Sequence, residues 1–194
     1  LSFIEVITQP DAIKIISADI SDNNGYGVTC PGSADGSITV VVQGGTPPLV
    51  LEWTGPAGFT SDQPSISMLG AGEYMLTISD AAGCILTADY TLTAPEALDI
   101  SAVTADASCP DTPDGDIDLT VSGGSGTLAF LWNDGATVAD RTDILSGDYS
   151  VDVTDVSGCT TTFEITVGVR GLDCLRIYEI ITPNGDGRND TWQL

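Results

Sequence analysis

Two stretches of the chain repeat one another. "TCPGSADGSITVVVQGGTPPLVLEW" (29–53) aligns with "SCPDTPDGDIDLTVSGGSGTLAFLW" (108–132), so that the matching Cys, Asp-Gly, Gly-Gly and Trp positions all lie 79 residues apart. Further along, "LGAGEYMLTISDAAGC" (69–84) matches "LSGDYSVDVTDVSGC" (145–159). The second copy is four residues shorter between its Trp and its Tyr, where a loop tolerates deletion. The chain therefore contains a duplicated unit.

Apolar residues alternate with polar ones inside each copy. Ile38, Val40 and Val42 share one parity, and the same alternation recurs at 117–121 and at 149–153. Alternation over five to seven residues predicts half-buried strands, and the Gly-Gly, Pro-Pro and Asp-Gly pairs between them predict turns. Six or seven short strands in each copy predict an all-β fold of tandem immunoglobulin-like β-sandwich repeats.

One Trp and one Tyr recur in each copy. Trp53 and Trp132 follow alternating apolar residues, which places them on the inward face of a strand, and we expect them to pack in the core. Tyr74 and Tyr149 each come shortly after a Leu and a Gly. This spacing predicts a tyrosine corner, in which the phenol ties a loop to its strand.

The composition is strongly acidic. Five Lys and Arg residues against 28 Asp and Glu residues give a formal charge of −23, which disfavours nucleic acid and anionic membranes and favours divalent cations. No apolar run approaches the roughly 20 residues of a membrane helix, so we expect no membrane insertion. The chain has no His, the commonest general base. With no catalytic motif among the acidic residues either, we expect no enzyme activity.

Four of the five cysteines, Cys30, Cys84, Cys109 and Cys159, fall at matching places in the two copies. Pairing within each copy, Cys30 with Cys84 and Cys109 with Cys159, is the economical hypothesis, and such a bond would stabilise its sandwich by roughly 4 kcal/mol on the chain-entropy model. Metal binding is the alternative, but no CxxC pair and no His supports it. Disulfides indicate a compartment outside the cytoplasm. Cys174 remains without an assigned partner.

The segment "ITPNGDGRND" (181–190) has three interpretations: a plain turn, a calcium loop, or the opening of a further domain. Asn184, Asp186 and Asp190 place oxygen ligands at alternate positions, with glycines that permit a tight wrap around calcium. Arg188 departs from the EF-hand pattern, and no Glu closes the loop. A second acidic cluster, Asp111, Asp114 and Asp116, keeps only Asp35 in the first copy, so a turn is expected there.

The chain resembles the repeat unit of SprB-type gliding-motility adhesins of Bacteroidetes. The resemblance rests on the order Cys, Asp-Gly-Ser-Ile, Gly-Gly-x-x-Pro, Trp, Gly-x-Tyr and Asp-x-x-Gly-Cys. The second copy departs from it at Gly126, where the family has Pro. The Tyr-to-Cys stretch is also similar to PKD domains. "ITPNGDGRND" resembles the start of the C-terminal gliding-motility-associated domain that directs proteins through type IX secretion.

This resemblance implies an organisation and a function. Residues 1–10 would be the last strand of a preceding repeat, 11–95 and 96–170 two sandwiches, and 171–194 a linker with the truncated start of a sorting domain. The implied function is a non-catalytic stalk or adhesin segment, attached to the outer membrane, with the type IX machinery or an anchor protein as partner of the C-terminal segment. Its ligand would be a surface polysaccharide or a protein. The alternative is the stem of a secreted enzyme or carbohydrate-binding protein.

Overall fold

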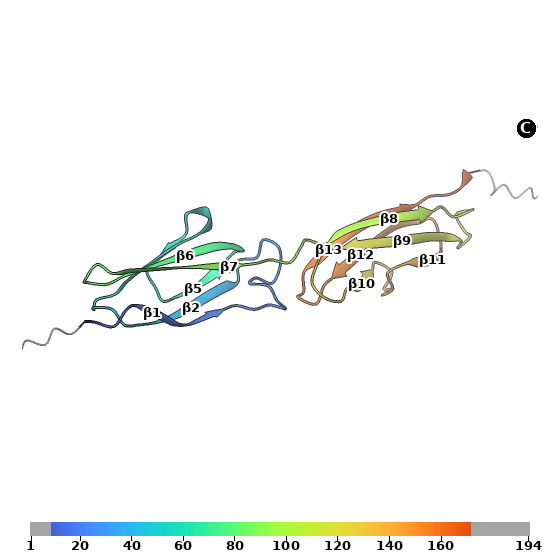
Figure 1. The fold of residues 1–194 in the computed structure, drawn as a ribbon. Coiled ribbons are helices and arrows are strands. Elements are labelled where there is room, and N and C mark those ends of the chain that lie inside the picture. The colour runs from blue at the N-terminus through green and yellow to red at the C-terminus, as the bar shows by residue number, and fades with distance from the viewer. Residues whose placement is uncertain (1–8, 172–194) are drawn as a thin grey trace, which may run out of the picture. The chain divides into compact units, whose positions relative to one another are not determined.

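A computed structural model describes residues 9–171. Over these residues the chain folds into four β-sheets and one 3-10 helix, η1 (Pro56–Gly58), with no α-helix in the described range. The sheets form two sandwiches, which follow one another along the chain and are coloured blue to green and green to orange in Figure 1. The prediction of an all-β fold with tandem immunoglobulin-like sandwiches is confirmed.

The first sandwich has one sheet of three strands and one of four, in the orders β1-β2-β5 and β4-β3-β6-β7. Neighbouring strands in these two sheets pair antiparallel. The strands are β1 (Lys14–Ile20), β2 (Gly36–Gln43), β3 (Val50–Thr54), β4 (Thr60–Ser61), β5 (Ser65–Leu69), β6 (Gly72–Ser79) and β7 (Ile85–Leu92).

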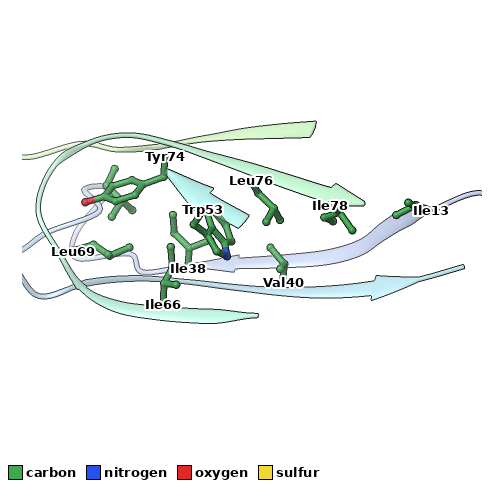
Figure 2. Close-up of a cluster of buried hydrophobic side chains, with 10 residues drawn as sticks. Ile13, Ile38, Val40, Trp53, Ile66, Leu69, Tyr74, Leu76 and Ile78 are labelled. Carbon is green, nitrogen blue, oxygen red and sulfur yellow. The ribbon is translucent and has the colours of Figure 1, made fainter. Parts of the chain in front are cut away.

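The core of the first sandwich lies between its two sheets. Figure 2 shows Trp53 of β3 among aliphatic side chains from both sheets, and its ring is fully buried. Ile38 and Val40 of β2 are buried, whereas Thr39 between them and Val41 after them are exposed, as the alternation predicts. A buried indole is stable only when its N–H finds an acceptor, and here Nε1 donates to the carbonyl of Gln63 at 2.9 Å.

The second sandwich has two three-stranded sheets, in the orders β11-β9-β8 and β10-β12-β13. Trp132 takes the place of Trp53, is 2% exposed, and donates from Nε1 to the carbonyl of Val138 at 2.8 Å. Both tryptophans are therefore core residues, as predicted. The strands are β8 (Asp99–Ala105), β9 (Gly115–Ser122), β10 (Ala129–Trp132), β11 (Arg141–Ile144), β12 (Gly147–Thr154) and β13 (Thr160–Val167).

The shorter segment of the second copy coincides with the loss of two small elements. The first sandwich has η1 and β4 between β3 and β5, whereas the second has only a turn between β10 and β11. Arg141 of β11 lies 5.2 Å from the ring centre of Trp132, and it also forms an ion pair with Asp134 at 2.6 Å. One of the few cations of the chain thus packs on the core Trp of the second sandwich.

The Gly-Gly pair of each copy packs against the segment that precedes the first strand of its sandwich. Gly44 and Gly123 have φ of +84° and +79°, a region that favours glycine. A Cβ on these residues would lie 2.1 Å from the carbonyl oxygen of Ala12 and 2.0 Å from that of Ala97, respectively. The motif therefore recurs because the backbone approaches too closely for any side chain.

The predicted tyrosine corners are both present. Tyr74 donates its hydroxyl to the carbonyl of Gly70 at 3.0 Å, and Tyr149 donates to the carbonyl of Leu145 at 2.9 Å. Each bond closes the turn that leads into its strand, β6 or β12. Tyr74 is buried, so its hydroxyl depends on this acceptor.

We expect Tyr74→Phe to lower the free energy of unfolding by about 1 kcal/mol, because it removes one hydrogen bond and leaves the Gly70 carbonyl unpaired. The matched control is Tyr90→Phe, since the Tyr90 hydroxyl has no hydrogen-bond partner within residues 9–171. Urea titration followed by tryptophan fluorescence measures both. Equal effects of the two substitutions would contradict a stabilising tyrosine corner.

Candidate functional site: the cysteine-bearing turns

The two cysteines of the first sandwich lie at opposite ends of it. Cys84 comes directly before β7. The loop that carries Cys30 lies beyond the other end of the same strand, because the Val28 N–H donates to the carbonyl of Thr93 at 3.2 Å. A strand of eight residues spans roughly 24 Å. Cys30 and Cys84 are therefore about a strand length apart.

The second sandwich repeats this placement. Cys159 comes directly before β13, and the Ala107 N–H donates to the carbonyl of Gly168, just past the end of β13, at 3.1 Å. Cys109 follows Ala107 by two residues and so lies at the far end of β13 from Cys159. Each sandwich thus has a cysteine at both ends.

The disulfide seen in the structure joins the two copies. Cys30 is bonded to Cys159, with an S–S distance of 2.04 Å and a Cα–Cα distance of 5.6 Å. Cys109 is also disulfide-bonded, whereas Cys84 is a free, exposed thiol. The predicted pairs Cys30–Cys84 and Cys109–Cys159 are wrong, because a disulfide requires Cα atoms within about 7 Å and the last strand of each sandwich keeps these pairs much farther apart.

An aspartate holds the turn before each of Cys84 and Cys159. Oδ1 of Asp155 accepts the N–H groups of Ser157 and Cys159, both at 2.9 Å. Its Oδ2 accepts the N–H of Ser125 at 2.8 Å and the hydroxyl of Ser125 at 2.9 Å. The motif Asp-x-x-Gly-Cys is therefore a turn closed by its own carboxylate, and the same carboxylate ties it to the Gly-Gly loop.

Asp80 does the same in the first copy. Its Oδ1 accepts the N–H groups of Ala82 at 2.9 Å and Cys84 at 2.8 Å, and its Oδ2 accepts the N–H of Thr46 at 2.9 Å. The two turns match bond for bond, apart from the additional hydroxyl of Ser125. The free Cys84 is thus held in the same way as the bonded Cys159.

A second pair of aspartates holds the loops of the other two cysteines. Asp35 accepts the N–H of Thr29 at 3.1 Å and also the Thr29 hydroxyl. Asp114 accepts the N–H of Ser108 at 2.7 Å. Thr29 and Ser108 directly precede Cys30 and Cys109, so the Asp of the Asp-Gly motif fixes the backbone next to the cysteine. Sequence reasoning noted both aspartates but gave them no such role.

These hydrogen bonds lower the pKa of the carboxyl groups. The backbone N–H groups of Thr46 and Cys84 lower the pKa of Asp80. For Asp155, burial raises the pKa, but the hydrogen bonds from Cys159 and Ser125 outweigh burial and the net pKa is below the ordinary value. Each of these carboxylates therefore stabilises the fold in its ionised form.

No group of three or more acidic or cysteine side chains placed to hold a metal ion is found within residues 9–171. Asp111 lies in a turn, as predicted, in which the Thr112 N–H donates to the carbonyl of Cys109 at 3.1 Å. Asp114 lies just after this turn, and the prediction is wrong for Asp116, which belongs to β9. The predicted calcium ligands Asn184, Asp186 and Asp190 lie outside the described residues. Over the described range, no helix is long and apolar enough to cross a membrane.

The SprB repeat family model matches two segments of the chain, residues 28–58 and 101–137. These segments hold the first Cys, the Asp-Gly, the Gly-Gly and the Trp of each copy, so the chain contains SprB-type repeats. No curated protein matches the chain.

Among solved structures, the chain is similar to the N-terminal eight Ig domains of Down Syndrome Cell Adhesion Molecule isoform 1.30.30, at 13% identity and a TM-score of 0.31, over 80% of this chain and 27% of that one. It is also similar to the N-terminal four Ig domains of Dscam1 isoform 6.9, at 12% identity and a TM-score of 0.30, over 71% of this chain and 41% of that one. The chain thus corresponds to about a quarter to two fifths of these structures.

The bonding pattern can be checked on the protein as purified. Alkylation without reduction should label Cys84, and peptide mapping should recover Cys30 linked to Cys159. The reason is that Cys30 and Cys159 are bonded to each other in the structure, whereas Cys84 is a free and exposed thiol. Recovery of a Cys30–Cys84 peptide would contradict this assignment.

We expect Asp155→Asn to destabilise the protein by about 2 kcal/mol at pH 7, because an amide cannot accept all of the converging N–H groups. The folded pKa of Asp155 is lowered, so its contribution is fully present above the unfolded pKa of about 3.9 and is lost as pH falls through the folded pKa. The difference between variant and wild type should therefore shrink below about pH 4.

Urea titrations of both proteins between pH 7 and pH 2.5 measure this difference, and global charge effects cancel in it. Asp118→Asn, an exposed position on β9, is the control and should show little effect at any pH. A difference between Asp155→Asn and wild type that stays constant down to pH 2.5 would contradict a stabilising carboxylate.

Proposed function

We propose that this chain is a stalk segment of a large, non-catalytic cell-surface adhesin. The observation that carries the proposal is the match of the SprB repeat model to the same part of both copies. Tandem sandwiches of one type extend a surface protein unit by unit, with each unit contributing its own core. The Cys30–Cys159 bond adds a covalent link between the two copies.

Two physical properties support a location at the cell surface. Disulfides persist outside the reducing cytoplasm. The two cysteines of each copy lie at exposed ends of a sandwich, so a reducing compartment would keep them as thiols. The formal charge of −23 favours solubility in a crowded extracellular layer and disfavours contact with anionic membranes.

The role in gliding and the export route belong to the same proposal and rest on the resemblance of the terminal sequence. Residues 181–190 carry the string that resembles a type IX secretion domain. We assign residues 171–194 as the segment that the secretion machinery or an outer-membrane anchor recognises, with calcium at Asn184, Asp186 and Asp190. The ligand of the adhesin would be a surface polysaccharide or a protein.

The non-catalytic assignment is supported by what the acidic side chains do. Asp35, Asp80, Asp114 and Asp155 are engaged in backbone hydrogen bonds at turns. The chain has no His that could act as a base. The alternative function is the stem of a secreted enzyme, in which any catalysis takes place in another part of the protein. The experiment below distinguishes this function from that of an adhesin.

The test uses the bacterium that encodes the chain. An antibody against residues 9–171 should label intact cells, and labelling should disappear when type IX secretion is disrupted. Deletion of residues 9–171 in frame, with 172–194 kept, should reduce attachment and spreading on surfaces. The control is a gene without the deletion but with Asp118→Asn, which should support normal attachment.

Two outcomes would contradict the proposal. Labelling only after the cells are permeabilised would place the protein inside the cell. Normal attachment and spreading of the deletion strain, combined with loss of a secreted enzyme activity, would identify the chain as the stem of an enzyme.

A further inference from the structure

The four cysteines of the repeats fall into two kinds by position. Cys30 and Cys109 lie in the loop after the first strand of their sandwich, at the end where the last strand finishes; we name them tail cysteines. Cys84 and Cys159 come directly before the last strand, at the opposite end; we name them head cysteines. Both tail cysteines are disulfide-bonded, but only one head cysteine is.

The free head cysteine, Cys84, is presented in the same way as its bonded counterpart. Its N–H is held by Asp80 at 2.8 Å, and the N–H of Cys159 is held by Asp155 at 2.9 Å. The turns have the same length, "DAAGC" and "DVSGC". Cys159 is bonded to a tail cysteine. The backbone that carries the Cys84 thiol is therefore held in the same way as the backbone of a cysteine that is bonded to a tail cysteine.

The surroundings of Cys84 leave room for a partner. The thiol is exposed, and a hollow of about 290 Å³ lies beside it, lined by Pro10, Ala12, Ile85 and Leu86 among others. Ile85, the residue next to Cys84, is 67% exposed. The tail cysteine of the same sandwich cannot fill this place, because the length of β7 separates the two ends.

We propose that Cys84 forms a disulfide with the tail cysteine of another repeat unit, as Cys159 does with Cys30. Bonds from tail to head would then link each SprB-type unit to the next one. The occupant of the hollow is the cysteine loop of that unit, of the type "TCPGSADG". The inference goes beyond the proposed function, because it holds whether the chain belongs to an adhesin or to the stem of an enzyme.

The chemistry is an ordinary thiol–disulfide exchange. The two thiols lose two protons and two electrons and form one S–S bond. The disulfide of an exchange catalyst or of oxidised glutathione takes up these protons and electrons and becomes two thiols. Because the tail cysteine precedes the head cysteine within each unit, successive disulfide-closed loops overlap along the chain. A single backbone cut inside such a series leaves the fragments covalently joined.

The test adds one unit to the full chain. A second copy of residues 9–93 is inserted after Thr93, so that Thr93 is followed by Gln9 and Pro10, much as it is normally followed by Ala94 and Pro95. In the inserted copy, Ile85→Val marks the Cys84 peptide by mass and Ala34→Ser marks the Cys30 peptide, both at exposed positions. The protein is refolded with oxidised and reduced glutathione, and its thiols are counted and mapped.

The proposal predicts that the inserted unit adds two cysteines but no free thiol. Cys30 of the first copy should be linked to the marked Cys84 peptide, and the inserted Cys30 to Cys159. Cys84→Ser in the inserted copy should then add one free thiol. The proposal is overturned if the inserted Cys30 is linked to Cys159, which shows that the chain has folded, while the marked Cys84 is fully alkylated.

Discussion

The last strand of each sandwich imposes the constraint on which the covalent structure depends. β7 and β13 each have eight residues, and each lies between a cysteine that directly precedes it and a cysteine loop at its far end. A disulfide cannot span that distance, so Cys30 cannot bond to Cys84, nor Cys109 to Cys159, and the Cys30–Cys159 bond joins the two copies. In immunoglobulin domains the core disulfide crosses between the two sheets. Here the cores contain Trp53 and Trp132, and the cysteines lie at the ends of the sandwiches.

Specific aspartates explain why a chain of such high negative charge keeps ordered cysteine loops. Asp80 and Asp155 close the turn before the head cysteines, and Asp35 and Asp114 fix the residue before the tail cysteines. In each place backbone N–H groups compensate the carboxylate, since Lys and Arg are scarce. The repeated motifs Asp-Gly and Asp-x-x-Gly-Cys thus do the same thing: each fixes the backbone at or next to a cysteine at the end of a sandwich.

Much of the fold could be predicted because period-two alternation and the spacing around Trp and Tyr report local structure. The disulfide pairing could not, because it depends on which end of the sandwich each loop reaches. That depends on how many times the chain crosses the sandwich between Cys30 and Cys84, and one crossing involves β4, a strand of only two residues that leaves no periodic pattern. Matching positions in two copies identify equivalent cysteines, but they do not distinguish a bond within a unit from a bond between units.

The most direct test of this account is the extension of single molecules under force, with handles on residues 9 and 171. The Cys30–Cys159 bond removes 129 residues from the path under tension, which is about 460 Å of contour length at roughly 3.6 Å per residue. In a background of Cys84→Ser and Cys109→Ser, which also removes the Cys109 disulfide, adding Cys30→Ser should therefore lengthen the fully extended molecule by about that amount. If Cys30 were instead bonded to Cys84, the Cys84→Ser substitution would already have removed that bond, and adding Cys30→Ser would leave the length unchanged. An unchanged length would therefore contradict the Cys30–Cys159 bond.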